Sequence, residues 1–172
     1  MRKSIKVFAP ATVANVGCGY DVLGFALEGY GDELILTRRH DDQLVIASIE
    51  GVQGLPLAPE KNVSTVAIKT LLADLDLKQG FDLRIKKNIA AGSGLGSSAS
   101  SAAAAVYAAN EMLGRPKSQL ELINYAMAGE KLASTKAHAD NVAPSILGGF
   151  TAVRSYEPLD VFNISYPESL KV

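Results

Sequence analysis

The sequence has one cysteine, no excess of either charge and no long apolar run, and each shortage excludes a class of protein. Cys18 alone cannot form an internal disulfide or a cysteine-rich zinc site. Seventeen basic and eighteen acidic residues give a net charge of -1, which provides no overall field for nucleic acid or an anionic bilayer. No run reaches the roughly 18 apolar residues of a membrane span, and Pro10 interrupts the short apolar stretch after the basic N-terminal tip. We therefore expect a cytoplasmic protein without signal peptide or membrane anchor.

The remaining composition is typical of a globular domain. The chain has 172 residues, 48% of them hydrophobic, and a mean hydropathy of +0.13. This length is sufficient to bury a real core, and the composition argues against disorder. No internal repeat and no change of composition marks a second domain within the sequence.

Several short segments have the pattern of strands: residues 5–9 and 81–85 alternate apolar with other residues, and 32–38 and 43–49 contain short apolar runs. These predicted strands cover residues 5–9, 32–38, 43–49, 81–85, 149–154 and 160–166. Pro10 should end the first strand, with a loop over 11–21. The polar turn 39–42 should join the second and third strands into a hairpin.

Helical spacing occurs in three longer segments. Residues 63–75 follow Asn62, a plausible N-cap, and residues 118–133 begin with Ser118 and have Glu121 three positions later, the spacing of a capping box. A third helix should begin near Ser98 in alanine-rich sequence.

A glycine-rich loop precedes that third helix. Gly92, Gly94 and Gly96 lack Cβ atoms, so the backbone can approach a ligand, and the helix N-terminus would favour an anion such as phosphate. The loop lacks the closing Lys of a P-loop and the spacing of a dinucleotide fingerprint. Alternatives are a flexible linker, or a helix that needs small residues for close packing.

Three segments resemble a known family. Residues 87–106 (KNIAAGSGLGSSASSAAAAV) are similar to a signature of the GHMP small-molecule kinases, which include galactokinase, mevalonate kinase and homoserine kinase. Segments 9–21 (APATVANVGCGYD) and 136–144 (KAHADNVAP) resemble homoserine kinases. Sugar and mevalonate kinases have a Lys in the first of these segments, where this chain has Thr12, and a Glu-His later.

The resemblance covers essentially the whole chain and departs from many homoserine kinases at Val13 and Cys18. It implies an α+β fold, the GHMP kinase N-terminal domain, which is like a ribosomal-protein domain with a left-handed β-α-β unit. That domain should occupy residues 1–172. A C-terminal domain, absent from this chain, should carry a further glycine-rich motif and carboxylate-binding arginines.

The resemblance also implies an ATP and Mg²⁺ site. Ser98 and Glu130 match the positions that hold Mg²⁺, and Asn62 and Lys87 match the region around the nucleotide base. The phosphate loop would consist of Gly92, Ser93, Gly94, Leu95, Gly96, Ser97 and Ser98. The alternatives are a solvated Glu130 paired with a lysine, and an Asn62 that only caps a helix.

The remaining matches concern the acceptor, L-homoserine. Asp21 would bind its ammonium group, while Asn15, His138 and Asn141 match other substrate-facing positions. Asp140 matches a proposed catalytic base of mevalonate-type relatives, although direct attack without a base is the alternative. As alternatives to ligand binding, Asn15 and Asp21 could be turn formers beside glycines, and His138 could be structural.

The expected activity is therefore transfer of the γ-phosphoryl group of ATP to homoserine, a step of threonine biosynthesis, with Glu130 and Asp140 as catalytic residues. One alternative is a related kinase for another small alcohol. Another is an RNA-binding module, which the balanced charge and the lack of a basic stripe with aromatic residues disfavour. We expect neither a nucleic-acid nor a membrane partner, and we leave a homodimer open.

Overall fold

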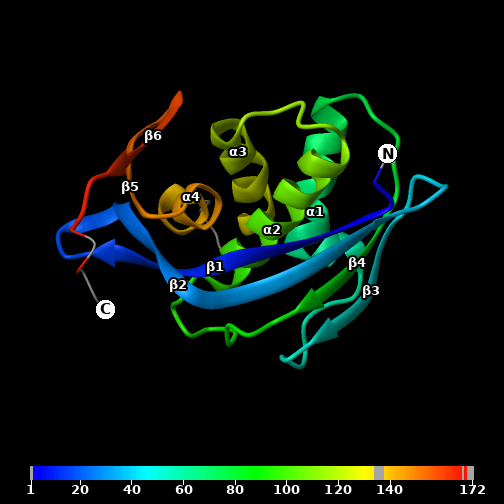
Figure 1. The fold of residues 1–172 in the computed structure, drawn as a ribbon, viewed down its shortest axis with the longest axis horizontal. Helices are drawn as coiled ribbons and strands as arrows, with labels where there is room; N and C mark the ends of the chain where they lie inside the picture. The colour runs from blue at the N-terminus through cyan, green and yellow to red at the C-terminus, as the bar shows by residue number, and fades with distance from the viewer. Residues whose placement is uncertain (1, 134–137, 168, 170–172) are drawn as a thin grey trace.

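The protein has one curved sheet with its helices packed against one face (Figure 1). The computed structural model describes residues 2–133, 138–167 and 169, which form a six-stranded sheet, four α-helices and a short 3-10 helix. The elements in chain order are β1 (Ser4–Val16), β2 (Gly19–Arg38), β3 (Leu44–Glu50), η1 (Pro59–Lys61), α1 (Val63–Asp74), β4 (Phe81–Lys86), α2 (Ser97–Met112), α3 (Gln119–Glu130), α4 (Ala139–Leu147), β5 (Phe150–Tyr156) and β6 (Leu159–Ile164). The expected α+β class is confirmed.

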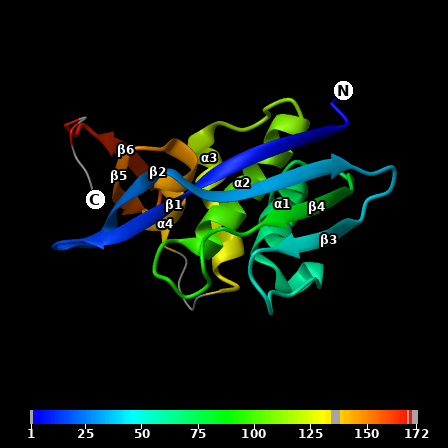
Figure 2. The ribbon, with the colours of Figure 1, turned by 60° about the horizontal axis from the view of Figure 1, so that its bottom comes forward.

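The 20-residue strand β2 organises the sheet. One of its edges pairs antiparallel with β1 from Thr37 back to Gly19, so the two strands run side by side across the molecule (Figure 2). The other edge pairs with β4 in its second half and with β5 in its first half. The resulting order is β3-β4-β2-β5-β6, with β1 on the opposite side of β2.

The predicted hairpin between 32–38 and 43–49 is wrong. Strand β4 lies between β2 and β3, antiparallel to the first and parallel to the second. Its core-facing residues Leu83 and Ile85 lie opposite Leu36 and Leu34 of β2. The apolar pattern within a strand cannot decide which of two candidate strands pairs with β2. Here the partner is β4, the candidate that is more distant in the sequence.

The predicted loop over 11–21 is also wrong. Strand β1 continues through Pro10 to Val16, with register shifts between Pro10 and Thr12 and between Ala14 and Val16. Pro10 is tolerated because β1 pairs on one side only and its pairing is interrupted directly after the proline. The chain then reverses around Gly17, whose φ of 58° favours glycine.

The other predicted elements are confirmed within a few residues of their bounds. Asn62 accepts a hydrogen bond from the Ser64 N–H (3.0 Å) at the start of α1, and Ser118 and Glu121 form the expected capping box on α3. Helix α4 was not predicted, because it is short and contains Pro144.

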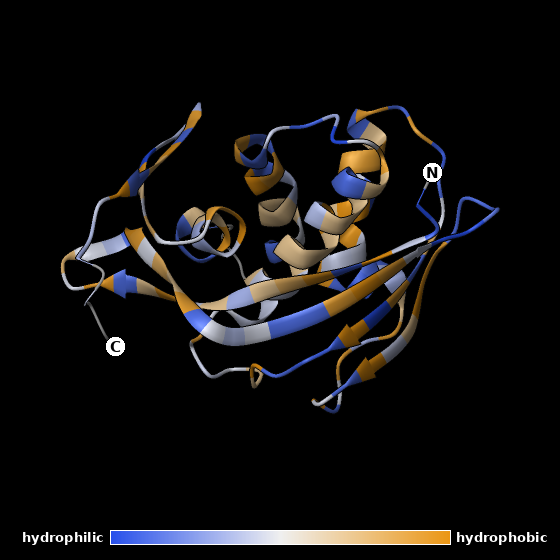
Figure 3. Cartoon of the chain, viewed as in Figure 1, coloured by the Kyte–Doolittle hydropathy of each residue, from blue (hydrophilic) through white to orange (hydrophobic). Residues whose placement is uncertain are grey.

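Helix α2 lies at the centre of the helical layer and contacts α1, α3, α4, β1 and β2. Twelve of its 16 residues are buried, and its alanines allow close approach of the surrounding elements. The core is completed by larger apolar side chains, among them Leu34, Ile68, Phe81 and Leu122. In Figure 3, β4 shows the alternation of apolar and polar residues expected of a strand with one buried face.

A larger side chain within α2 should destabilise the protein. Ala105 is fully buried, so Ala105→Leu should lower the free energy of unfolding by about 1 to 3 kcal/mol through overpacking. Ala73→Leu, at an exposed position of α1, is the matched control and should leave it nearly unchanged. Denaturant unfolding of both variants measures the difference, and equal stabilities would contradict the close packing of α2.

Candidate functional site

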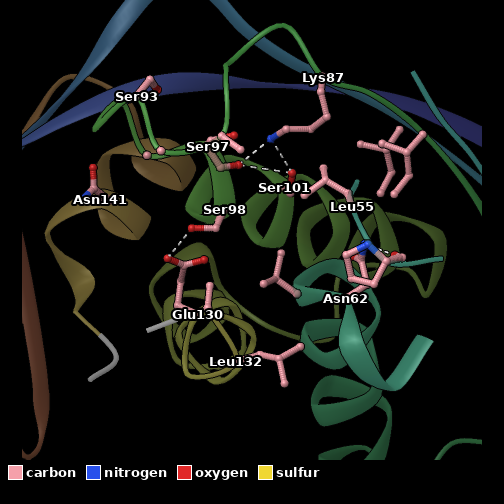
Figure 4. Close-up of a pocket in the computed structure, with 18 of the residues that line it drawn as sticks. Leu55, Asn62, Lys87, Ser93, Ser97, Ser98, Ser101, Glu130, Leu132 and Asn141 are labelled. Carbon is pink, nitrogen blue, oxygen red and sulfur yellow. Dashed lines mark hydrogen bonds between the residues drawn. The ribbon is translucent and has the colours of Figure 1, made fainter. Parts of the chain in front are cut away.

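A pocket of about 550 Å³ opens between the glycine loop, the loop before α1 and the end of α3. This volume lies within the roughly 300–1,000 Å³ of small-molecule sites. Figure 4 shows Asn62 on one side of the pocket and Asn141, beside the glycine loop, on the other. The predicted nucleotide residues in its lining are Asn62, Lys87, Gly92, Ser93, Gly94, Gly96, Ser97, Ser98 and Glu130.

The glycine loop connects β4 to the N-terminus of α2, as the sequence predicts. Gly92 and Gly94 have φ values of 75° and 77°, and a Cβ on either would meet no other atom within 4 Å. Glycine is favoured at these two positions by the positive φ of the backbone and not by close packing. Gly96 differs, because a Cβ there would overlap the hydroxyl of Thr12. The packing alternative therefore applies to Gly96, while Gly92 and Gly94 leave the loop open towards the pocket.

Ser98 and Glu130 lie together on one wall of the pocket (Figure 4). The Ser98 hydroxyl, in the first turn of α2, donates to Glu130 Oε2 at the end of α3 (2.9 Å). Burial raises the pKa of the Glu130 carboxyl, against the opposing effects of Ser98 and the Lys87 charge. Glu130 is half-buried and hydrogen-bonded to a serine, so it is not the solvated side chain considered as the alternative from the sequence.

Lys87 lies at the base of the glycine loop, where its amine is buried. Its Nζ forms an ion pair with Asp32 and donates to the Ser97 carbonyl (2.6 Å) and the Ser101 hydroxyl (2.9 Å). The side chains of Lys87 and Asp32 are only 2% and 1% exposed. Burial lowers the pKa of the Lys87 amine, and Asp32 acts in the opposite direction. The amine is therefore held by protein groups, and its predicted contact with the base stays a prediction.

Asp32 was missed by the sequence analysis. Its Oδ1 accepts hydrogen bonds from the Asn88 N–H (2.8 Å) and the Ile89 N–H (3.0 Å), so it fixes the chain as it leaves β4. The available signal was an acidic residue in phase with Leu34 and Leu36, on the core face of a predicted strand.

Asn62 serves the helix and the pocket at once. Besides capping α1, its amide Nδ2 donates to the Pro56 carbonyl (3.1 Å), and the residue is buried in the pocket wall. The helix-cap role is confirmed, and contact with a nucleotide stays a prediction.

The predicted acceptor residues meet where the β1–β2 turn approaches α4. Asn15 Oδ1 accepts from the Asp21 N–H (2.9 Å), and Asp21 Oδ1 lies 3.2 Å from His138 Nδ1. Tyr156 adds a contact that the sequence did not indicate, because its hydroxyl donates to the Asp21 carbonyl (2.8 Å). Asn15 and Asp21 both have a φ of 57°, but they lie in β1 and β2, on either side of the turn at residues 17–18, and the Asp21 side chain remains 55% exposed.

Asp140 lies in the first turn of α4, next to this acceptor cluster. It is almost fully buried, and this burial raises the pKa of its carboxyl. The nearby His138 lowers that pKa, and the charge of Asp21 raises it. Its Oδ1 accepts a hydrogen bond from the Asn141 N–H (3.0 Å). Asn141 lines the pocket, so α4 connects the pocket with the acceptor cluster.

Other expectations concern metals, membranes and the segment before α4. Within the described residues, no three His, Cys, Asp or Glu side chains gather as a metal site, and no helix is long and apolar enough to cross a membrane. Cys18 is exposed and free. Lys136 and Ala137, the first residues of the third resembling segment, lie outside the described residues.

Comparison with known proteins identifies the family. The model of the GHMP kinases N terminal domain matches residues 62–149, half of the chain. The chain belongs to the GHMP kinases. The resemblance found in the glycine loop and its helix is thereby confirmed.

Individual GHMP kinases show the same relationship. The chain is 49% identical to a homoserine kinase of Chlorobium phaeobacteroides (strain DSM 266) over 98% of its length, and 42% identical to one of Methanococcus maripaludis (strain C5) over 94%. It spans only 56% and 54% of these relatives, about half their length.

Solved structures support the fold. The crystal structure of a homoserine kinase from Cytophaga hutchinsonii matches with a TM-score of 0.92 and 50% identity, covering 97% of this chain and 53% of that one. A mevalonate kinase of Methanococcus jannaschii matches with a TM-score of 0.73 at 20% identity, over 94% of this chain and 56% of that one, which supports the fold alone.

The buried ion pair provides a test of how the glycine loop is anchored. Lys87→Met leaves the Asp32 charge buried without its partner, so we expect a loss of about 3 to 5 kcal/mol in unfolding free energy. Lys86→Met, at the exposed neighbouring position, should change it by less than about 0.5 kcal/mol. Denaturant unfolding measures both.

A double variant separates charge from packing. Asp32→Asn keeps an oxygen that can accept from the Asn88 and Ile89 N–H groups but removes the charge, so Asp32→Asn/Lys87→Met should be more stable than Lys87→Met alone. A double variant as unstable as the single one would contradict a charge-based role.

Proposed function

We propose that this chain is the N-terminal part of a homoserine kinase, which transfers the γ-phosphoryl group of ATP to the side-chain hydroxyl of L-homoserine and yields O-phospho-L-homoserine for threonine biosynthesis. The observation that carries the proposal is the meeting at Asn141 of two half-sites: the pocket of the glycine loop, and the acceptor cluster of Asn15, Asp21 and His138. This residue lines the pocket of the glycine loop and belongs to the helix that begins at the acceptor cluster. Similarity to homoserine kinases at 42–49% identity supports the choice of acceptor.

In this proposal ATP occupies the pocket, with its phosphates at the glycine loop. Backbone N–H groups of the loop and the N-terminus of α2 favour an anion, and Ser93 and Ser98 provide hydroxyl groups. The Ser97 hydroxyl already donates to the Ile89 carbonyl (2.9 Å). The adenine base would lie at the side of the pocket formed by Asn62, Leu55 and Pro56. Lys87 would act mainly by holding the loop from beneath.

The residues on the pocket wall fit a magnesium ion. A serine hydroxyl and a carboxylate 2.9 Å apart are hard oxygen ligands, and Mg²⁺ in nucleotide sites takes only one or two protein groups and keeps phosphate and water as the others. Ser98 and Glu130 would hold it. When bound, the ion would neutralise charge on the phosphate oxygens.

The acceptor cluster fits a small zwitterion. Asp21 presents an exposed carboxylate for the ammonium group, held in place through its backbone by Asn15 and Tyr156. His138 and Asn141 provide polar groups on the α4 side. Asp140 is the candidate base, since burial raises the pKa of its carboxyl and so favours proton acceptance from the hydroxyl. Direct attack, driven by positioning alone, remains the alternative.

We further propose that a C-terminal domain completes the acceptor site. The homoserine kinases that this chain resembles are almost twice as long. The acceptor cluster of Asn15, Asp21 and His138 also contains no arginine that could bind the carboxylate of homoserine. Residues 1–172 would form the ATP-binding domain, and turnover would require the complete protein. Interfaces between domains of one chain commonly bury a sizeable area.

The substrate is tested by ADP release from the complete protein. With Mg²⁺ and ATP, we expect turnover of L-homoserine far above that of mevalonate, galactose or shikimate, because Asn15 and Asp21 replace the Lys and Glu-His pattern of the sugar and mevalonate kinases. Comparable turnover of mevalonate would contradict the proposed acceptor and favour a kinase for another alcohol.

The metal role is tested by Glu130→Gln. Because burial raises the pKa of Glu130, its contribution to stability is present at low pH and is lost as pH rises through the folded-state pKa. The neutral glutamine should therefore fold at least as stably at neutral pH, while kcat falls by about 100-fold or more as charge stabilisation is lost.

Glu28→Gln, an exposed position on β2, is the control and should behave like wild type. A Glu130→Gln enzyme with wild-type kcat at limiting Mg²⁺ would contradict the role of Glu130.

A further inference from the structure

Thr12 joins the two half-sites physically. It is fully buried in β1, and its backbone N–H and its hydroxyl reach different parts of the molecule. Its backbone N–H donates to the Leu95 carbonyl in the glycine loop (3.1 Å), and its Oγ1 donates to Asn141 Oδ1 on α4 (2.8 Å). One residue therefore contacts both the phosphate loop and the acceptor side.

The irregular path of β1 frees Thr12 for this role. The register with β2 shifts between Pro10 and Thr12, and the unpaired edge of β1 instead docks against the helices. Ser100 on α2 donates to the Ala9 carbonyl (3.0 Å), and Ser145 on α4 donates to the Pro10 carbonyl (3.4 Å). These contacts leave little freedom for Thr12.

Packing restricts Thr12 further. A Cβ at position 96 would overlap its hydroxyl, so the backbone of Gly96 lies directly against it. The hydroxyl is confined between the glycine loop and Asn141.

The direction of this hydrogen bond decides what Asn141 offers to a ligand. A side-chain amide has an oxygen that only accepts and a nitrogen that only donates. Since Asn141 Oδ1 accepts from Thr12, the amide nitrogen must point elsewhere, and Asn141 lines the pocket. An amide nitrogen at this place can donate to phosphate oxygens or to a hydroxyl oxygen. A flipped amide would present an oxygen, which repels phosphate oxygens and can only accept a hydrogen bond from a hydroxyl.

We propose that Thr12 is a positioning residue: its hydroxyl fixes the Asn141 amide with the nitrogen towards the transferred phosphoryl group and the acceptor hydroxyl. The role of Asn141 as a ligand rests on the proposed function. The role of Thr12 rests on the contacts of the loop, β1 and α4, and it acts through Asn141 rather than on the substrates.

Thr12→Val tests this inference in the complete protein, because it removes the hydroxyl at nearly constant shape. We expect kcat/KM for homoserine to fall roughly fivefold to tenfold, the effect of one hydrogen bond, with the KM for ATP within about twofold of wild type. Thr12→Ser keeps the donor and should restore most of the activity. Thr151→Val is the matched control, since Thr151 is also fully buried and its hydroxyl donates to the Gly24 carbonyl (3.3 Å).

A double-mutant cycle with Asn141→Ala distinguishes positioning from a general structural effect. If Thr12 acts through Asn141, Thr12→Val should cost nothing further once the amide is absent. Three results would each overturn the proposal: losses of kcat/KM that add in the double variant, wild-type activity of Thr12→Val, or a Thr12→Ser enzyme as impaired as Thr12→Val. If Thr12→Val does not fold, Thr12→Ala takes its place in the cycle.

The outcome is separable from that of the proposed function. If the wild-type protein phosphorylates another alcohol but not homoserine, the proposed acceptor is wrong. The cycle measured on that alcohol still decides the role of Thr12.

Discussion

The buried pair of Asp32 and Lys87 holds together the part of the structure from which the rest of the site is built. One oxygen of Asp32 binds the Lys87 amine, and the other accepts from the backbone that leaves β4. The amine also binds the Ser97 carbonyl in the first turn of α2. Strand β2, the base of the glycine loop and the helix that would face the phosphates are thus fixed to one another. A charge pair this deeply buried tolerates little displacement, because either charge alone would be costly.

From that anchor the two half-sites follow by topology. The glycine loop runs to α2 from the end of β4, which lies opposite Glu33 in the interior of β2, and the acceptor cluster lies at the start of β2, where the β1–β2 turn meets α4. Thr12 and Asn141 connect them across the middle of β1. In the proposed function, the long β1–β2 pair would set the spacing between phosphoryl donor and acceptor, which is the main requirement for phosphoryl transfer.

Local features of the site could be predicted from the sequence, and long-range ones could not. The Asn62 cap, the Ser118–Glu121 capping box and the glycine loop before α2 depend on residues close in sequence. The insertion of β4 beside β2 depends on pairing between distant segments of equal pattern. The roles of Asp32 and Thr12 depend on partners 55 and 129 positions away. The family resemblance identified candidate ligands, but only the structure shows that the Lys87 amine is already engaged.

A crystal structure of the complete protein with homoserine and a non-hydrolysable ATP analogue tests the shared site most directly. The account predicts the triphosphate along residues 92–98, the homoserine ammonium at Asp21, and the Asn141 amide nitrogen directed towards the γ-phosphate or the acceptor hydroxyl, with its oxygen still on Thr12. A nucleotide bound away from the glycine loop, or homoserine bound away from Asp21 and Asn141, would contradict it.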